Sequence, residues 1–198
     1  MPNHTQNNLH VYGAAGKVAE ARALILTYNN EAGEWEVDFH LVKPMPRDLN
    51  IISGSVGTTA YAALFGSEDA WNRIIEYPWV PGEVRTRRDL TRFLMAQNDD
   101  NSGRFSPSWT AAGEEYHRNI SRYGYVSWYE WCTSEWGTKW NAYDCSVVQD
   151  EPTHLEVHFN TAWSPPIGVY AALQERVPEA TFEAYWADEG CDDFDSVL

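Results

Sequence analysis

The side chains whose types and spacing most clearly suggest chemistry are the carboxylates in the last third of the chain. From Asn141 to Leu198 the sequence holds twelve acids against one base, Arg176, which gives a net charge of −11. The first 140 residues hold seventeen acids and thirteen bases, so they contribute only −4 of the total of −15. Carboxylates repel phosphates, which argues against direct nucleic-acid binding by this part of the chain. Two interpretations remain open: a solvated surface that favours solubility, or a face that imitates a phosphate backbone and enters the basic groove of a protein.

Nine of these acids are our candidates for a partner-binding face. Some lie in predicted strands and others in the run from Asp188 to Asp195. That run is rich enough in oxygen ligands to suggest a divalent cation, but its spacing does not match the EF-hand calcium loop. We therefore predict a solvated acidic tail there and no metal site. The nine candidates are Asp144, Asp150, Glu151, Glu156, Glu183, Asp188, Glu189, Asp192 and Asp193.

Histidines offer a second kind of chemistry. His154 and His158 are four residues apart, which on a helix would place two metal ligands on one face. The surrounding alternation predicts a strand instead, where they stand ~13 Å apart at the usual rise per residue. This distance is too long for one metal ion, so we expect both to face solvent. For His4 we expect a polar contact with the aromatic core rather than a catalytic role.

Nucleophiles and phosphate-binding loops do not stand out. The segment from Gly54 to Gly57 does not fit the Gly-x-Ser-x-Gly elbow. It is not a phosphate loop either, because no Gly-Lys-Ser/Thr follows the glycines. Nothing in the sequence places a histidine beside Cys132. The sequence therefore favours a non-catalytic protein without a cofactor. The one basic cluster is expected to pair with nearby acids, with anion binding as the alternative; it consists of Arg85, Arg87, Arg88 and Arg92.

Tryptophans are concentrated between Tyr123 and Asp144. Ser127 can cap a helix that begins at Trp128, and Gly137 is suited to the left-handed residue that ends it. This much indole fills a core or forms a contact surface, and we expect the core. We expect Lys139 to form a salt bridge with Glu130, Glu135 or Asp144, with anion contact as the alternative. The candidates for an aromatic or anion contact are Trp128, Trp131, Trp136, Lys139 and Trp140.

This run also carries a family resemblance. The string Trp-Gly-Thr-Lys-Trp-Asn-Ala-Tyr-Asp at 136–144 resembles the signature of the YubB-like family of phage and plasmid proteins. Three further stretches agree with it: 1–4, 38–46 and 159–166, whereas residues 50–108 match nothing in that family. The resemblance implies a ferredoxin-like domain and a mobile genetic element as the setting. It implies no particular reaction.

Hydrophobic periodicity predicts the elements that position these residues. Strands are expected at 7–12, 35–42, 143–149, 154–159 and 181–186. Helices are expected at 14–27, 68–76, 88–97, 107–123, from 128 to Gly137, and from Pro165 and Pro166 to Arg176. The small residues at 51–60 indicate a flexible segment, and 98–103 is the most loop-like run. Without the strand at 35–42 and the helical block, the order is β-α-β-β-α-β.

That order predicts an α+β fold with a ferredoxin-like, split β-α-β sheet. We expect one domain over 1–198, with a core from about 5–46 and 138–190 and a mostly helical insertion at about 48–137. The three cysteines, Cys132, Cys145 and Cys191, cannot supply a four-thiolate cluster, and their odd number and wide spacing favour reduced thiols. No stretch is apolar enough for a membrane span, and no secretory signal is evident, so a cytoplasmic location is expected, and the family resemblance implies a bacterial host.

These observations favour an accessory protein of a phage or plasmid that binds without catalysis. Its partner would be a host protein that normally binds nucleic acid, such as a defence nuclease complex, which the acidic face inhibits by mimicry. The alternative is a small-molecule or nucleotide-binding protein, with or without enzymatic activity. Its aromatic pocket would be lined from Trp128–Tyr143 and Arg85–Arg92. The target and the oligomeric state do not follow from the sequence.

Overall fold

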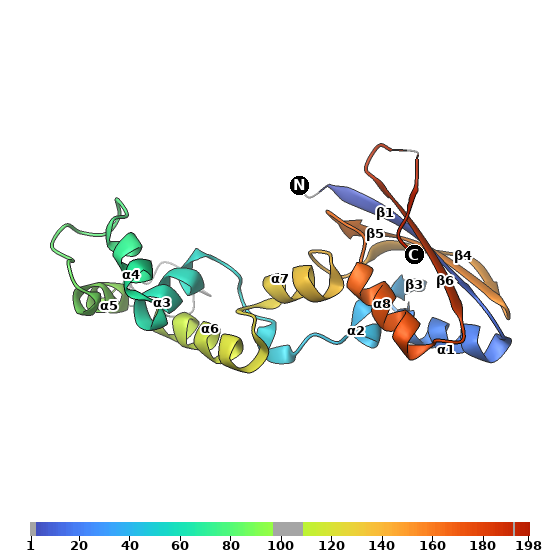
Figure 1. The fold of residues 1–198 in the computed structure, drawn as a ribbon, viewed down its shortest axis with the longest axis horizontal. Coiled ribbons are helices and arrows are strands. Elements are labelled where there is room, and N and C mark those ends of the chain that lie inside the picture. Colours follow the sequence, from blue (N-terminus) through green and yellow to red (C-terminus); the bar gives the residue numbers. More distant parts are fainter. Residues whose placement is uncertain (1–2, 97–108, 192) are drawn as a thin grey trace. The chain divides into compact units, whose positions relative to one another are not determined.

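The computed structural model of the 198-residue chain describes residues 3–96, 109–191 and 193–198. The chain forms two compact units. The first unit combines Met1–Met45 with Tyr129–Leu198, and the second spans Pro46–Trp128 (Figure 1). Among the described residues, no helix has the length and apolar character that crossing a membrane requires.

An antiparallel sheet forms the centre of the first unit. Its four long strands are β1 (His4–Tyr12), β4 (Tyr143–Glu151), β5 (His154–Ala162) and β6 (Thr181–Asp188), and the two-residue β7 (Asp195–Ser196) pairs with β6. The spatial order is β4-β5-β1-β6-β7. Helix α1 (Ala15–Ile25) follows β1, and α8 (Ile167–Arg176) joins β5 to β6. This arrangement is ferredoxin-like and confirms the predicted α+β class.

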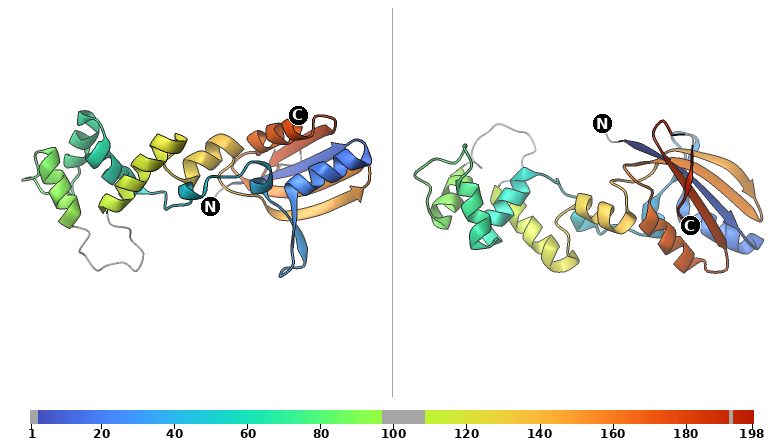
Figure 2. Two further views of the ribbon diagram at one scale, coloured as in Figure 1. Left: turned by 90° about the horizontal axis from the view of Figure 1, so that it is seen from below. Right: turned by 45° about the horizontal axis from the view of Figure 1, so that its top comes forward.

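One face of this sheet is apolar and is covered by α1 and α8, which lie on the same side of it (Figure 2). Residues at alternate strand positions are buried, among them Leu9, Val11 and Val157. The helices contribute Val18 and Leu173 to the same core. Because strand side chains alternate between faces, the remaining positions of β1, β5 and β6 point to the opposite side.

The predicted strand at 35–42 was half wrong. Strand β3 (Glu34–Val37) pairs with β2 (Leu26–Asn29) in a separate hairpin, and Phe39–Val42 forms the short helix α2. The carboxylate of Asp38 accepts a hydrogen bond from the backbone N–H of His40 at 3.0 Å, which is the role of an N-cap. This local hydrogen bond ends the strand in spite of the alternating pattern. The predicted helix at 14–27 likewise ends at Ile25, since Leu26 begins β2.

The tryptophan-rich run begins with α7 (Trp128–Trp131) and continues as one π-helical turn, η3 (Cys132–Trp136). Gly137 follows in the left-handed conformation at φ 88°, as predicted. Trp136 is only 1% exposed, and its indole N–H donates to the carbonyl of Lys43 at 2.9 Å. The buried ring of Trp131 meets Trp136 edge to face at 5.3 Å. These two indoles fill the core.

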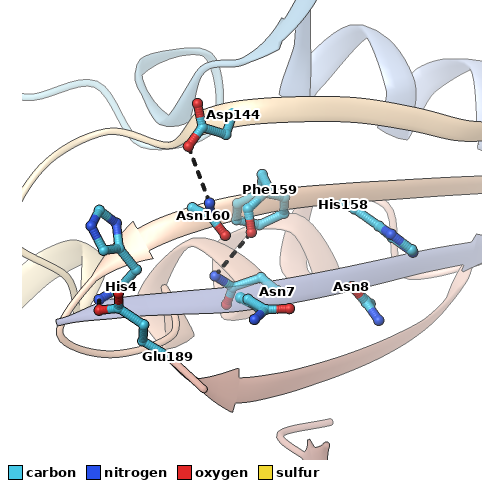
Figure 3. A pocket seen from close by; sticks show the side chains of 9 residues that line it. His4, Asn7, Asn8, Asp144, His158, Phe159, Asn160 and Glu189 are labelled. Carbon is cyan, nitrogen blue, oxygen red and sulfur yellow. Dashed lines mark hydrogen bonds between the residues drawn. The ribbon is translucent and has the colours of Figure 1, made fainter. Parts of the chain in front are cut away.

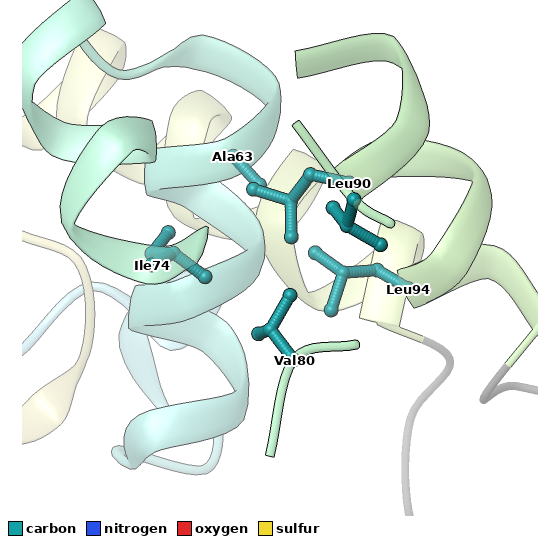
Figure 4. Close-up of a cluster of buried hydrophobic side chains, with 6 residues drawn as sticks. Ala63, Ile74, Val80, Leu90 and Leu94 are labelled. Atoms are coloured by element: carbon teal, nitrogen blue, oxygen red, sulfur yellow. The ribbon is translucent and has the colours of Figure 1, made fainter. Parts of the chain in front are cut away.

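Helices make up the second unit. They are η1 (Arg47–Leu49), α3 (Ser55–Phe65), α4 (Glu68–Ile75), α5 (Arg87–Ala96) and α6 (Trp109–Tyr123). Helices α4, α5 and α6 lie where the sequence predicted them; residues 97 and 107–108, and the predicted loop at 98–103, lie outside the described residues. Residues of α3, α4, α5 and the segment between α4 and α5 meet in a core that Figure 4 shows. This core consists of Ala63, Ile74, Val80, Val84, Leu90 and Leu94.

Residues 55–60 of the segment that the sequence predicted to be flexible, 51–60, belong to helix α3. Its small residues allow close packing rather than mobility: a Cβ at Gly57 would overlap the ring of Tyr116, and one at Gly113 would crowd Ala60. The Tyr116 hydroxyl also lies 3.1 Å from the backbone N–H of Gly54, just before α3. Close approach of α3 to α6 therefore explains Gly57 and Ala60 in this stretch.

Candidate functional site

The side of the sheet opposite α1 and α8 is lined by polar and aromatic side chains, and we call it the polar face. Strand pairing determines its members, because residues directly opposite in an antiparallel pair share a face. His10 is opposite Glu156 and Glu183, and Asn8 is opposite His158 and Tyr185. The members from β1, β5, β6 and β4 are His4, Gln6, Asn8, His10, Tyr12, His154, Glu156, His158, Asn160, Glu183, Tyr185, Tyr143, Ser146, Gln149 and Glu151.

Negative charge on the polar face is not balanced by positive charge from the same strands. Glu151, Glu156 and Glu183 belong to the face, and Asp144 and Glu189 lie beside it. Strands β1, β4, β5 and β6, of which the structure describes every residue, contain no lysine or arginine. The face therefore offers carboxylates, amides and imidazoles to a ligand.

An open pocket of about 460 Å³ lies at one end of the polar face (Figure 3). Asp144 occupies a β-bulge at φ 51°, and its carboxylate accepts a hydrogen bond from the Asn160 amide at 3.2 Å. Glu189 follows β6, and its carboxylate accepts from the backbone N–H of His4 at 3.3 Å. Both carboxylates are thus held by neighbouring strands. The lining residues are His4, Gln6, Asn7, Asn8, Asp144, His158, Phe159, Asn160 and Glu189.

His4 is held at this pocket by Tyr143. Nδ1 of His4 lies 2.6 Å from the Tyr143 hydroxyl, and the rings meet edge to face. That hydroxyl also lies 3.1 Å from the carbonyl of Thr161, which can accept its hydrogen. Burial, followed by the charges of Asp144 and Glu189, raises the pKa of Tyr143 above 10.0, so the phenol stays neutral. The polar contact of His4 is thus with one aromatic residue, Tyr143, and it lies at the pocket.

Imidazoles and a carboxylate cluster farther along the polar face. Nδ1 of His10 lies 3.4 Å from Nε2 of His154 and 3.9 Å from a carboxylate oxygen of Glu156. The other Glu156 oxygen lies 2.7 Å from Nε2 of His158. The sequence prediction compared His154 with His158 alone and missed His10, which is far away in sequence. A ferredoxin-like topology requires β1 to pair with β5, and this pairing could have revealed His10 as a neighbour of the β5 residues.

The remaining candidate acids are distributed around the unit. Asp150 lies on the helix-covered side, where its carboxylate pairs with Arg22 of α1 at 3.1 Å. Asp188 is opposite Thr5 in the register, which also assigns it to that side. Asp193 is exposed beyond β6, and Asp192 lies outside the described residues. The structure thus assigns Glu151, Glu156 and Glu183 to the polar face and Asp144 and Glu189 to positions beside it, and it places Asp150, Asp188 and Asp193 elsewhere.

The predicted salt bridge of Lys139 is replaced by an aromatic contact. Its ammonium lies 4.5 Å from the ring centroid of Trp140 and 4.6 Å from that of Trp163. Glu135, one of the three expected partners, instead pairs with Lys43 at 2.6 Å. Cation–π attraction requires no anion, so Lys139 has a structural partner. Trp128 and Trp140 are half-buried.

The basic cluster of the second unit has neighbours of its own. Arg87 donates to the carbonyl of Ala63 at 2.8 Å, and Arg92 lies 3.9 Å from Asp89. Arg85 donates to the Gly82 carbonyl at 3.4 Å. Together with Leu64, Thr91 and Met95, the arginines 87, 88 and 92 line an open pocket of about 590 Å³. Backbone contacts and one ion pair thus occupy part of this cluster.

Two of the three cysteines are weak candidates for nucleophilic chemistry. Burial raises the pKa of Cys132 to about 12. Burial likewise raises the pKa of Cys145 to about 11, against a smaller opposing effect of a backbone hydrogen bond to Val37. The thiolate is the reactive form, so both side chains stay as unreactive thiols at neutral pH.

The last third of the sequence is similar to a known type of domain. Residues 135–194, which include β4, β5, α8 and β6, match the family model described as the ferredoxin-like domain in Api92-like protein. This match agrees with the sheet topology. Among solved structures, the chain is similar to the crystal structure of a protein Api92 from Yersinia pseudotuberculosis, at 12% identity and a TM-score of 0.44 over 99% of this chain and 94% of that one. No curated protein matches the chain.

Proposed function

We propose that this chain is a non-catalytic binding protein that engages a positively charged segment of a partner protein through the polar face. The observation that carries this proposal is the unbalanced charge of that face. Five carboxylates lie on it or beside it, and its four long strands, fully described, have no lysine or arginine. Complementary charge accelerates association and suppresses wrong partners, even where it adds little affinity.

The groups around the carboxylates favour a protein partner. Amides from Gln6, Asn8 and Asn160 can hydrogen-bond to backbone or to arginine, and the rings of Tyr12 and Tyr185 offer contact area. A phosphate backbone would be repelled by the same face. A basic groove that otherwise accepts nucleic acid fits it best by charge.

The finer setting of the proposal rests on the family resemblance. YubB-like proteins belong to phages and plasmids, so we place this chain in the cytoplasm of a bacterial host as an accessory protein of a mobile element. A host nuclease complex has a groove of the required charge. In that setting the polar face would inhibit the nuclease by occupying its nucleic-acid groove.

Capture of partners from bacterial lysate tests the proposal. The full chain is immobilised and washed at low and at high salt, and retained proteins are identified by mass spectrometry. Because exposed charge pairs are screened by salt, we expect a discrete basic protein that is retained at low salt and released at high salt. Recovery of no such protein at low salt would contradict the proposal.

A second candidate function follows from the pocket in Figure 3. Its volume of about 460 Å³ lies in the range of small-molecule sites. Trp131 and Trp136 fill the core, so an aromatic pocket built from them is not available; the polar pocket takes its place. Asp144 and Glu189 disfavour a nucleotide phosphate and favour a ligand with an amine or guanidinium group. Mass spectrometry of small molecules released from the purified protein tests this alternative.

A further inference from the structure

We propose that His10, His154 and Glu156 bind one divalent transition-metal ion, for which Zn²⁺ is the best match. Each residue offers one ligand atom, and the three atoms lie within 4.8 Å of one another. The residues come from β1 and β5, which pair so that His10 is opposite Glu156 and Tyr12 is opposite His154. This inference goes beyond the proposed partner binding and does not depend on it.

The distances are close to those of a tetrahedral site. Ligand atoms about 2.0–2.1 Å from a tetrahedral Zn²⁺ are roughly 3.4 Å apart. The two histidine nitrogens are already 3.4 Å apart, and the His10 nitrogen and the Glu156 oxygen are 3.9 Å apart. Small side-chain rotations would therefore close the site without movement of the strands.

Neighbouring rings hold both imidazoles in place. The ring of Tyr12 stacks on His154 with 4.3 Å between centroids and 14° between planes. The ring of Tyr185 meets His10 edge to face at 5.9 Å. Ligands that are fixed by packing on adjacent strands lose little entropy when a metal binds.

The groups around the cluster support a bound cation. His158 hydrogen-bonds to the second oxygen of Glu156 at 2.7 Å, and such an outer contact orients a ligating carboxylate. Glu183 is opposite His10 on β6 and adds negative charge to the surroundings. Both features favour the occupied state.

The ligand set also indicates the type of metal. Two imidazoles and one carboxylate suit Zn²⁺ and its transition-metal neighbours, whereas Mg²⁺ and Ca²⁺ prefer oxygen ligands alone. The side chains of His10 and Glu156 remain 18% and 19% exposed, so solvent reaches the cluster. Three protein ligands would leave a fourth position for water.

Metal titration of the full chain tests this inference. The protein is stripped with a chelator and dialysed, and Zn²⁺ binding is measured by calorimetry and elemental analysis. We expect one Zn²⁺ per chain, with affinity reduced more than about 100-fold in His10→Ala and His154→Ala, since loss of an outer contact alone costs about 10- to 100-fold. His158→Gln should fall within that smaller range. The matched control His40→Ala removes a histidine that pairs with Asp38 on another element, and it should leave binding unchanged.

Two further measurements keep the test decisive. Circular dichroism of each variant shows whether it folds, and the visible absorption of bound Co²⁺ reports tetrahedral nitrogen and oxygen ligands. Binding that survives in a folded His10→Ala/His154→Ala double variant would overturn the inference. So would the absence of Zn²⁺ binding in the unaltered chain, or binding that is lost in Cys191→Ser instead.

Discussion

At the residue scale, the carboxylates differ in what surrounds them. Asp150 is neutralised by Arg22, whereas Asp144 accepts a hydrogen bond from an uncharged amide and Glu183 from the hydroxyl of Tyr185. A hydrogen bond from a neutral group leaves the negative charge in place. Asp144 and Glu183 are therefore available to a cationic partner, whereas Asp150 is not.

Trp136 is the side chain on which the core of the first unit depends most. Replacing it with alanine should reduce the free energy of unfolding by about 3–5 kcal/mol, because the buried ring and the hydrogen bond to Lys43 are both lost. Trp163→Ala is the matched control. That indole is 43% exposed, so its loss should cost about 1 kcal/mol at most. Urea unfolding followed by circular dichroism measures both, and equal losses would contradict this assignment of the core.

Residue types alone predicted that these indoles would be buried, and this is confirmed for Trp131 and Trp136. The partner of Lys139 was predicted wrongly. A sequence gives the charges near a lysine along the chain, whereas Trp163 approaches Lys139 only through the fold. For the same reason, contacts between segments that are far apart in the chain could not be predicted from the sequence.

At the element scale, hydrogen bonds and close packing override periodicity. Asp38 caps α2 and ends a strand pattern that continues to Val42, and glycines in α3 and α6 permit a close helix contact. Long periodic segments such as α4, α6 and β5 were predicted well. Short segments were not, because one side-chain hydrogen bond outweighs the preference of four residues.

The contact between α8 and η3 requires a glycine. A Cβ at Gly168 would overlap the backbone carbonyl of Glu135, so Gly168→Ala should lower the free energy of unfolding by at least about 1–3 kcal/mol. Gly16→Ala in α1 is the matched control, because nothing lies within 4 Å of its added Cβ. That change should be neutral or stabilise the protein by up to about 1 kcal/mol. Chemical denaturation compares the two variants; a neutral Gly168→Ala would show that the elements are not in contact.

The cap on α2 predicts a dependence of stability on pH. The hydrogen bond from the His40 imidazole is the largest of the effects that lower the pKa of Asp38 below 3.8 in the folded state, and the backbone N–H of His40, which forms the cap, lowers this pKa further. The carboxylate therefore stabilises the fold fully at pH values above its unfolded pKa, and this contribution is lost as the pH falls through the lower folded pKa. Asp38→Ala should cost about 1 kcal/mol at neutral pH.

Denaturant titrations of the unaltered chain and Asp38→Ala from neutral to strongly acidic pH measure this effect. The difference in the free energy of unfolding between them should be constant near neutrality and shrink below about pH 4. A difference that grows as the pH falls would contradict the assigned cap.

At the scale of the whole molecule, the strand order was the most predictable property. Alternation in the segments at both chain ends, together with the family resemblance, was sufficient for the ferredoxin-like topology. The sequence named five acids that lie on or beside the polar face, but it missed His10, because which residues lie opposite one another depends on register: a shift of one residue in the pairing of a strand would turn its side chains to the other side of the sheet. His10 and Glu156 are far apart in the sequence and are neighbours only through the pairing of β1 with β5.

Two variants with the same net charge test the polar face most directly. The face variant is Asp144→Asn, Glu151→Gln, Glu183→Gln and Glu189→Gln, and it retains Glu156. The control variant is Glu31→Gln, Glu34→Gln, Glu175→Gln and Asp193→Asn, all at exposed positions that are not members of the polar face. Each variant loses four negative charges. Any difference between them therefore reports where the charge lies rather than how much there is.

The decisive measurement is the affinity of both variants and the unaltered chain for a labelled arginine-rich peptide, by fluorescence anisotropy at low salt. Exposed charge pairs contribute about 0.2–1 kcal/mol each, so the loss of four charges should weaken binding by the face variant at least about fourfold relative to the unaltered chain. The control variant should lose less than about twofold. Equal weakening of the two variants would show that the peptide responds to net charge alone, and the polar face would then have no claim to be the binding surface.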